Sequence, residues 1–501
     1  MIDTKALRQK ILDMAIKGKL VPQDPNDEPA SVLLEHIRAE KQQLIKEGKI
    51  KKDKNDSVIF KGDDNRYYEK VPRSWKICGV SDIAYLRTGA TFDKANMLLS
   101  NKNEGIRVLR GGNISTYKID FRADDIFIPA AIVNPSIYVQ QYDIITPAVT
   151  SLENIGKMAR VHTKPTSNYT VGGFVYLLSP LFYSDTFSKF LLYQFTSTWF
   201  IRQLQTIAKK SGAAFYNINK TKFNGLPVFI PPLEEQARIV NRIEELFTQI
   251  DIIEQNQADI DVLYDEFRKR TLTLAIQGKL VPQNPNDEPA SVLLERIRAE
   301  KKAKLGKKYV DSYIYKSDDN CYYEHIAGRA QDEPVEVPFD IPDNWAWSRI
   351  DGVAFLQSGK PFEELESGTP YVKVSDMNLS ENNIEITTSQ HYCKATSRDI
   401  IPASSIIFPK RGGAISTNKK RKVLSFYCCI DLNTMCMTPF LSQMLEYLFS
   451  WFLTIDLGMM HDGTSVPQIN NVDIYPLLVP IPPLADQKRI VAKINEIFTM
   501  L

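Results

Sequence analysis

The sequence predicts an α+β protein in which two globular α/β domains are separated by long antiparallel coiled-coil helices. Two observations lead to this prediction: one segment returns almost unchanged far along the chain, and one long stretch has apolar residues at steps of three and four. The repeat is also cyclically permuted, which divides one helical region between the two ends of the chain. We therefore expect a circularly permuted tandem repeat with pseudo-two-fold symmetry.

The strongest repeat is the segment GKLVPQDPNDEPASVLLEHIRAEK at residues 18–41, which returns as GKLVPQNPNDEPASVLLERIRAEK at residues 278–301. Only the positions of Asp24 and His36 differ between the two copies. Identity at this level indicates a duplication within the chain. Each copy is therefore expected to make the same contacts in its own half of the protein.

Weaker repeats extend the duplication over the rest of each half. The segment VPRSWKICGVSDIAYLRTGATF at 71–92 returns as IPDNWAWSRIDGVAFLQSGKPF at 341–362, which aligns Trp75 with Trp345 and Gly89 with Gly359. Each half then consists of one variable globular domain followed by one helical segment. A generic duplicated scaffold is the alternative interpretation of this layout. The predicted divisions are 1–56 (N-terminal part of the second helical region), 57–232 (first globular domain), 233–316 (central helical region), 317–483 (second globular domain) and 484–501 (C-terminal part of the second helical region).

The central helical region has the spacing of a coiled-coil seam. Its apolar members alternate at steps of four and three, with Gln257 and Thr271 as polar members. A helix that starts after IPPLEEQ and ends before Gly278 would hold roughly 44 residues and extend about 65 Å. The apolar residues of this seam are Ile239, Ile243, Leu246, Ile250, Ile253, Ile260, Tyr264, Phe267 and Leu274.

The second helical region begins in the same phase with Ile490 and Ile494 and reaches Leu501. Its remaining part is at the other end of the chain, where Leu7, Ile11 and Met14 take the places of seam residues. Counterparts of residues 251–260 are absent from this second copy. Because an apolar seam without a partner helix faces water, Ile253 and Ile260 are expected to be partly exposed.

The composition is that of an ordinary globular protein, with 43% hydrophobic residues and a net charge of +2. The six cysteines form no C-x-x-C pair and the five histidines are scattered, so we expect neither a disulfide framework nor a metal site. No stretch of about 18 uncharged apolar residues occurs, and the first residues lack the apolar core of a secretory signal. The expected location is the cytoplasm, without membrane association.

Motifs for catalysis are absent from the sequence. An adenine methyltransferase needs an Asn/Asp-Pro-Pro-aromatic loop for the flipped base and a glycine-rich turn for its cofactor, and neither is found. No G-x-x-x-x-G-K-[ST] loop for ATP occurs either. The chain is therefore expected to recognise a ligand, while any methyl transfer or ATP hydrolysis would come from partner proteins.

At this point the sequence resembles a known family. The order of a variable domain, an IPPLxxQxxIV entry, a long helix and the GKLVPQ exit, given twice, resembles the DNA specificity subunit of Type I restriction-modification systems. The resemblance extends over essentially the whole chain and includes the closing segments SGAAFYNIN and DGTSVPQIN of the two variable domains. Two other interpretations stay open: a self-contained or diverged DNA methyltransferase or nuclease, and an inactive remnant of recombination.

The resemblance implies a non-catalytic subunit that binds double-stranded DNA. Each globular domain would be a target-recognition domain that reads one half of a split target, and the helices would set the spacing. Two methyltransferase subunits would assemble on the chain, joined by restriction subunits in the full complex. S-adenosylmethionine and ATP would bind to those partners, so that the chain itself needs no cofactor.

The first candidate for DNA contact is PKRGGAISTNKKRKV at residues 409–423, where basic residues flank a flexible Gly-Gly turn. Lysines and arginines at such a turn can reach phosphates, and an arginine or asparagine can address base edges. A solvated basic hairpin is the alternative. The candidate residues in this segment are Lys410, Arg411, Asn418, Lys419, Lys420, Arg421 and Lys422.

The matching segment of the first domain, TSLENIGKMAR, is less basic, so that domain is expected to use further residues. These come from RVLRGGNIS and from the two lysines ahead of SGAAFYNIN. Different residues at matching places predict that the two domains read different bases. The candidates in the first domain are Arg107, Arg110, Asn154, Lys157, Arg160, Lys209 and Lys210.

Overall fold

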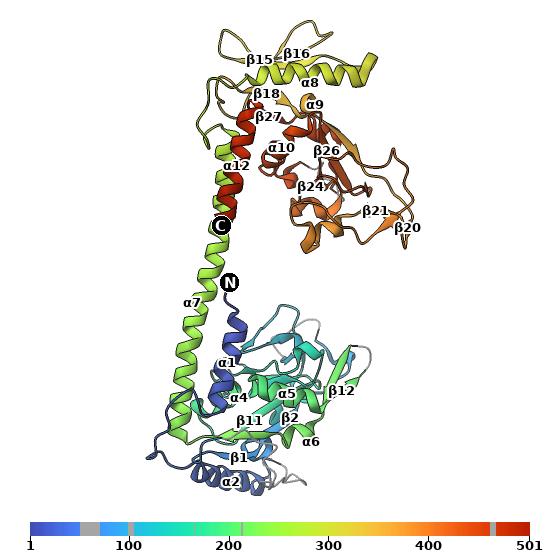
Figure 1. Ribbon diagram of the computed structural model, residues 1–501. Helices are drawn as coiled ribbons and strands as arrows, with labels where there is room; N and C mark the ends of the chain where they lie inside the picture. The colour runs from blue at the N-terminus through green and yellow to red at the C-terminus, as the bar shows by residue number, and fades with distance from the viewer. Residues whose placement is uncertain (51–70, 99–104, 166, 212–213, 461–466, 501) are drawn as a thin grey trace. The chain divides into compact units, whose positions relative to one another are not determined.

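The computed structural model describes residues 1–50, 71–98, 105–165, 167–211, 214–460 and 467–500. The chain mixes helix and sheet, and it divides into two compact units, residues 1–258 and 259–501. Helix α7 (Leu233–Ile276) contributes residues to both units and is drawn as one uninterrupted helix in Figure 1. The predicted division at residue 56 lies outside the described residues.

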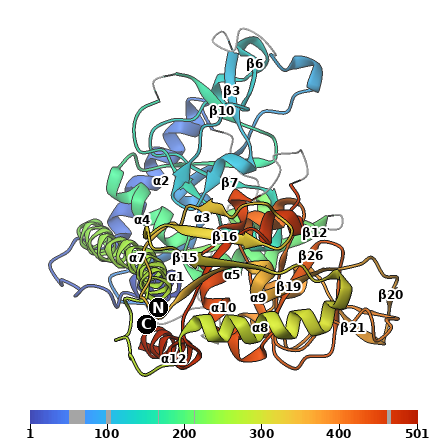
Figure 2. The same ribbon diagram turned by 90° about the horizontal axis from the view of Figure 1, so that it is seen from above.

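The first unit is built on an antiparallel sheet in the order β2-β11-β7-β9. Phenylalanines of α4 (Asp185–Phe195) and α5 (Thr198–Ile207) are buried in the same core as this sheet. A second sheet, in the order β10-β3-β6, is seen edge-on at the margin of the unit in Figure 2. The strands are β2 (Ala84–Thr88), β11 (Val175–Pro180), β7 (Ile144–Pro147), β9 (Ala159–Arg160), β10 (Tyr169–Val171), β3 (Gly105–Leu109) and β6 (Ile126–Pro129).

The second unit repeats the main sheet with the order β19-β26-β23-β24 and the same antiparallel pairing. Its helix α10 (Leu445–Phe452) is almost entirely buried, because its apolar side chains pack in the core of this unit. Beyond the main sheet, the second unit has the sheets β20-β22-β21-β25 and β15-β16-β17. The strands are β19 (Ala354–Ser358), β26 (Thr434–Pro439), β23 (Ser405–Pro409), β24 (Arg421–Val423), β20 (Glu364–Leu365), β22 (Tyr392–Cys393), β21 (Thr369–Val372), β25 (Cys429–Ile430), β15 (Ser312–Lys316), β16 (Tyr322–Ile326) and β17 (Glu333–Val335).

The glycine shared by the two repeats is required by a close backbone approach. A Cβ built on Gly89 would stand 2.1 Å from the carbonyl oxygen of Val171, and one on Gly359 would stand 1.9 Å from that of Asp431. No side chain fits at either distance. The end of β2 or β19 can therefore run against the neighbouring turn only with glycine at this position.

Helix α7 pairs with a different helix in each unit. In the first unit α1 (Thr4–Ile16) runs antiparallel to it, since the backbone N–H of Ile2 bonds the side chain of Gln257 while Arg8 reaches back to Asp251. In the second unit α12 (Leu484–Met500) runs antiparallel to α7. There Phe498 lies under Arg268, and Ile490 shares a core cluster with Ala275. In both units, therefore, the helix that packs on α7 runs antiparallel to it.

The repeated GKLVPQ segment makes the same contacts in both units. Asp27 pairs with Arg238 in the first unit, and Asp287 pairs with Arg489 in the second. The helix that follows is α2 (Ala30–Lys46) in the first unit and α8 (Ala290–Leu305) in the second. At its start the backbone N–H of Ala30 donates to the carbonyl of Ser74, and that of Ala290 donates to the carbonyl of Asn344. The segment therefore joins the start of each sheet to a long helix, which accounts for its near-identity.

Candidate nucleic-acid interface

In the first unit, one small sheet joins segments that are far apart in the sequence. Strand β8 (Val149–Thr150) follows the end of β7 and pairs with β13 (Phe215–Ile218), which pairs in turn with β12 (Ala208–Ser211). Lys209 and Lys210 lie on β12 and are exposed. The structure therefore places both lysines on the same small sheet as the segment that leads to Asn154.

The turn that carries Arg110 lies at the same end of the main sheet. Arg110 precedes the short helix η3 (Gly111–Asn113), and a Cβ added to Gly111 would stand 3.8 Å from Pro147 at the end of β7. Its side chain is 46% exposed, and its guanidinium lies 3.6 Å from the carboxylate of Asp124. Arg110 is thus an accessible cation beside β8.

The remaining candidates of the first unit are less accessible. Asn154 ends the short helix η6 (Leu152–Asn154) and donates to Ser151, while Lys157 is partly exposed. Arg107 stacks on Phe121 and Phe127, with its guanidinium 5.0 and 5.1 Å from the two ring centres. It lines a groove in which basic and aromatic side chains gather. Others in this groove are Lys118, Phe121, Arg160, His162, Lys164 and Tyr169.

Arg160 is a correction to the sequence prediction. Its side chain is only 1% exposed, its guanidinium is bonded to Asp185, and its Nε donates to Ser188 at 2.8 Å. Because its donors are already used within the unit, Arg160 supports the floor of the groove and is not available to DNA. Burial, assisted by the charge of Arg160, also lowers the pKa of the neighbouring His162.

The basic segment of the second unit is folded differently from the prediction. Residues Gly412–Thr417 form the short helix η10 instead of a flexible turn, and Asn418 closes it in the left-handed conformation with φ of 52°. Most of the basic side chains bond groups of the protein itself. Lys410 donates to Ser358, Lys419 to Asn378, Arg421 to the carbonyls of Asn382, Lys420 and Met377, and Lys422 to Glu446.

Lys420 is the second correction, because its side chain is buried at 2% exposure. Its ammonium donates to the side-chain oxygen of Asn418 at 2.8 Å and to the carbonyl of Ile455 at 2.7 Å. Burial lowers its pKa to about 7. Lys420 therefore holds the end of η10 in place, and it cannot reach a phosphate.

Arg411 is the exposed basic residue of this segment, and its backbone contacts match those of β8. It forms a bridge with Gln468, and the backbone N–H of Ile469 donates to the carbonyl of Lys410 at 2.8 Å. In the first unit the N–H of Ile218 donates to the carbonyl of Ala148 at 2.9 Å. Both units thus join the end of a central strand to the segment that closes the domain.

Two exposed aromatic residues at this end of the first unit were missed by sequence reasoning. Phe174 is 74% exposed in the turn between β10 and β11, and Phe215 is 56% exposed on β13. The Gly-Gly pair before Phe174 signals a turn. Nothing in the sequence separates an exposed phenylalanine from a buried one at such a place, because a turn has no period that predicts burial.

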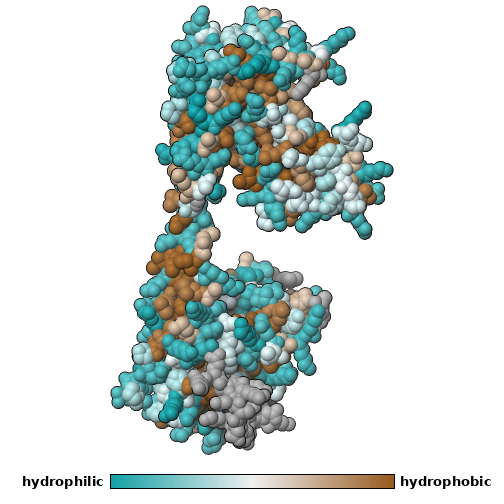
Figure 3. All heavy atoms as spheres, viewed as in Figure 1, coloured by the Kyte–Doolittle hydropathy of each residue, from teal (hydrophilic) through white to brown (hydrophobic). Residues whose placement is uncertain are grey.

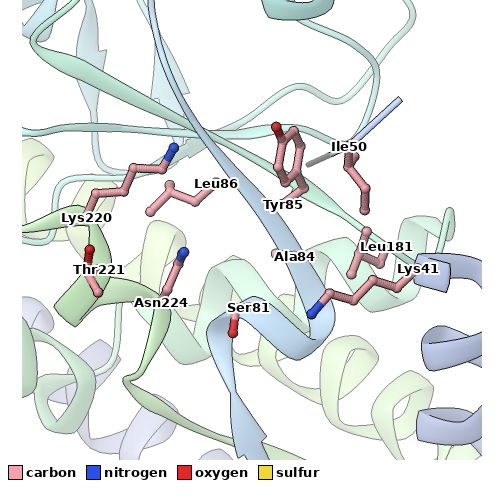
Figure 4. Close-up of a pocket in the computed structure, with 10 residues that line it drawn as sticks. All are labelled: Lys41, Ile50, Ser81, Ala84, Tyr85, Leu86, Leu181, Lys220, Thr221 and Asn224. Carbon is pink, nitrogen blue, oxygen red and sulfur yellow. The ribbon is translucent and has the colours of Figure 1, made fainter. Parts of the chain in front are cut away.

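A cavity elsewhere in the first unit contains none of the candidate residues. Figure 4 shows it between α2, β2 and α6 (Lys220–Asn224), with polar and apolar side chains interspersed. The described residues that line it include no acidic side chain that could act as a catalytic acid or base. Among the described residues, no group of three or more His, Cys, Asp or Glu side chains could hold a metal ion. The helices in the described ranges also include none that is long and apolar enough to cross a membrane.

Comparisons with known proteins agree on one family. A family described as Type I restriction modification DNA specificity domain matches residues 72–261 and 342–499. The EcoAI specificity subunit of Escherichia coli is 28% identical over 560 residues, which cover 98% of this chain and 88% of that protein. The EcoEI specificity subunit of Escherichia coli is 28% identical over 400 residues, 69% of this chain and 61% of that protein. A solved chain from a type I R-M system has the same fold, with a TM-score of 0.55 at 16% identity over 86% of this chain and 92% of its own.

Proposed function

This chain belongs to the Type I restriction modification DNA specificity family, and we propose that it reads a bipartite DNA target with one half-site for each of its two units. The observation that supports this proposal is the duplicated end of the main sheet. The same backbone arrangement recurs in both units, while the side chains on it differ. Arg411, for example, takes the place of Val149. Two units that share a backbone arrangement but carry different side chains on it can recognise two different base sequences.

The exposed cations and aromatics at these ends are the proposed DNA contacts. Arg110, Lys209 and Lys210 would bind phosphates or base edges in the first half-site, with Phe174 and Phe215 adding apolar surface. Arg411 would do so in the second half-site. The other lysines and arginines of the second segment would stabilise the fold that presents it.

The chain is proposed to act as a scaffold without chemistry of its own. Methyl transfer with S-adenosylmethionine would come from two methyltransferase subunits, and ATP hydrolysis from restriction subunits in the full complex. The helices would be arranged with pseudo-two-fold symmetry, which is supported by the matching antiparallel partners α1 and α12 on α7. The complex would act in the cytoplasm, where the DNA is.

Mapping methylated adenines in cells with and without this gene tests the proposal. We expect the gene to add one split target with two defined half-sites, and the purified chain alone to bind neither S-adenosylmethionine nor ATP in calorimetry. Methyl transfer by the pure chain would contradict the proposal, as would a methylation pattern that the gene leaves unchanged while its methyltransferase partner is present.

A further inference from the structure

The turns that carry Phe174 and Asn433 occupy the same place in the two units. The backbone N–H of Ala148 donates to the carbonyl of Phe174 at 2.8 Å, and that of Lys410 donates to the carbonyl of Asn433 at 2.8 Å. Both turns lead into the second strand of the main sheet, β11 or β26. The two residues are therefore equivalent in structure, although one is aromatic and the other an amide.

A second equivalence fixes a cation beside each turn. Arg110 and Lys373 each precede a short helix, and each has its backbone N–H bonded to a side chain three residues on, Asn113 at 2.8 Å and Asp376 at 2.9 Å. The residue just before each cation accepts a backbone bond from the turn, Leu109 from Gly172 and Val372 from Asp431. Each turn is thus held by backbone bonds on two sides, next to a basic residue.

The chemistry at this shared position differs between the units. Phe174 presents a phenyl ring that is 74% exposed and can make only apolar or stacking contacts. Asn433 is partly buried. Its Nδ2 donates to Asp431 at 2.8 Å, which orients the amide, and its Oδ1 and second Nδ2 hydrogen remain able to accept and donate. In the major groove, a phenyl ring complements the methyl group of thymine, while an asparagine amide complements the N6 and N7 edge of adenine.

We infer that Phe174 and Asn433 are specificity-determining residues at one equivalent position of the two units. Phe174 contacts a thymine methyl group in the first half-site, and Asn433 bonds an adenine edge in the second. This inference rests on the proposed function. It deepens that function by assigning a base class to each turn, with Arg110 holding the adjoining backbone of the DNA in the first half-site. In the second unit Lys373 is paired with Glu364 and stabilises the segment beside the turn.

The test is a selection from random DNA. The full chain, purified with its methyltransferase partner, is mixed with a pool of random 40-base-pair duplexes, and the bound DNA is sequenced. The variants are Phe174→Asn and Asn433→Phe. The control is Tyr183→Asn, because Tyr183 is also exposed, at 69%, but follows the opposite end of β11. Melting temperatures check that each variant is folded. Little change is expected at the exposed Phe174 and Tyr183, and the partly buried Asn433 is checked in the same way.

We expect Phe174→Asn to weaken the preference for thymine at one position of one half-site by about tenfold, the size of one good base contact. The other half-site should be unchanged. Asn433→Phe should change an adenine position in the other half-site in the same way, and Tyr183→Asn should leave both intact.

The inference would be overturned by a folded Phe174→Asn complex that selects the same sequences as the parent, or by one that loses both half-sites equally. Loss of complex formation with unchanged DNA selection would also overturn it, since Phe174 would then be a protein contact. A parent complex without any sequence preference would instead contradict the proposed function itself.

Discussion

In each unit one tryptophan donates a hydrogen bond from its indole N–H to an acidic residue in the first turn of a helix. The indole N–H of Trp75 donates to Glu235 at 2.9 Å, and that of Trp345 donates to Asp486 at 3.0 Å. Both acids are fully buried, and burial raises the pKa of Asp486 although the bond from Trp345 lowers it. A buried carboxylate is costly without donors, so each tryptophan contributes by its N–H as well as by its ring.

Trp345→Phe should therefore destabilise the second unit by about 1–3 kcal/mol, because Asp486 loses a donor in a buried site. Trp347→Phe is the matched control. That ring is as deeply buried, yet its N–H has no hydrogen-bond partner among the described residues. Urea unfolding of both variants measures the difference. Equal losses of unfolding free energy would mean that only ring packing matters at Trp345.

Lys420 makes stability depend on pH in a definite direction. Burial lowers its pKa to about 7, against 10.5 for an ordinary lysine, and Asp456 opposes this shift. Between these two values the unfolded chain binds more protons than the folded chain. The free energy of unfolding should therefore rise with pH across this window, because deprotonation relieves the cost of a buried charge.

Comparison of the parent with Lys420→Met isolates this effect, since methionine does not titrate. From pH 7 to pH 9 the parent should gain about 1 kcal/mol per pH unit relative to the variant. Urea unfolding at several pH values measures the gain, and other titrating groups cancel in the difference. Parallel curves for the two proteins would show that Lys420 keeps an ordinary pKa.

The accessibility of the candidate DNA-binding residues could not be predicted from the sequence. Consecutive basic residues indicate a positive charge, but they do not show whether each side chain is bonded to another group of the same protein. Lys422 is bonded to Glu446, which is 24 residues away, and Arg421 to Asn382, 39 residues away. Such partners depend on the fold of the unit, so Arg411 could not be distinguished from its neighbours in advance.

Among the elements, α7 was the most predictable. Its 44 residues agree with the length expected from the seam and the Gly278 stop, because period and end signals are local properties. The conformation of the Gly-Gly segment was predicted wrongly. A short helix forms there because Lys420 and Leu457 both bond the side chain of Asn418 and hold its end, and neither contact can be read from local sequence.

The middle of α7 carries an exposed apolar surface, as the sequence predicted for Ile253 and Ile260. Ile260 is 45% exposed, and Ile253 is partly buried. Figure 3 shows apolar side chains at the surface along this part of the helix. Exposed apolar side chains grouped on a helix are typical of an interaction surface. Its other members are Ile252, Val262, Leu263, Tyr264 and Phe267.

Replacing Leu263, which is 61% exposed, by glutamate should weaken assembly with the methyltransferase partner at least tenfold. The free energy of unfolding should change by no more than about 0.5 kcal/mol, because an exposed side chain contributes little to the core. Sedimentation of the mixed proteins measures assembly. Asn256→Glu is the control, since it adds the same charge without removing apolar surface. Equal assembly by both variants would exclude this surface as the partner site.

On the scale of the whole molecule, duplication was the feature that the sequence predicted best. Shared residues such as Gly89 and Gly359 serve identical backbone approaches, and the two main sheets have the same strand order. The sheet β15-β16-β17 and the second sheet of each unit were not anticipated. Short strands pair over long sequence distances, so their partners are fixed by the surrounding core and not by their own pattern.

With one half-site for each unit, the proposed function predicts that the length of α7 sets the spacing between the half-sites. Inserting one heptad after Ala258 keeps the seam in phase and lengthens the helix by about 10 Å. At about 3.4 Å per base pair this corresponds to roughly three base pairs. The inserted heptad consists of exposed polar residues and does not change the proposed DNA contacts of either unit. The base preferences of both half-sites should therefore stay the same.

Sequencing of methylated sites in cells that carry the insertion variant tests this proposal most directly. The expected result is the parental pair of half-sites separated by a gap about three base pairs longer. Rotation along the duplex can lower the amount of methylation, so the spacing of the sites is the measurement and not the rate. Methylation of targets with the original gap would contradict the proposal, because the helix would then not be the spacer.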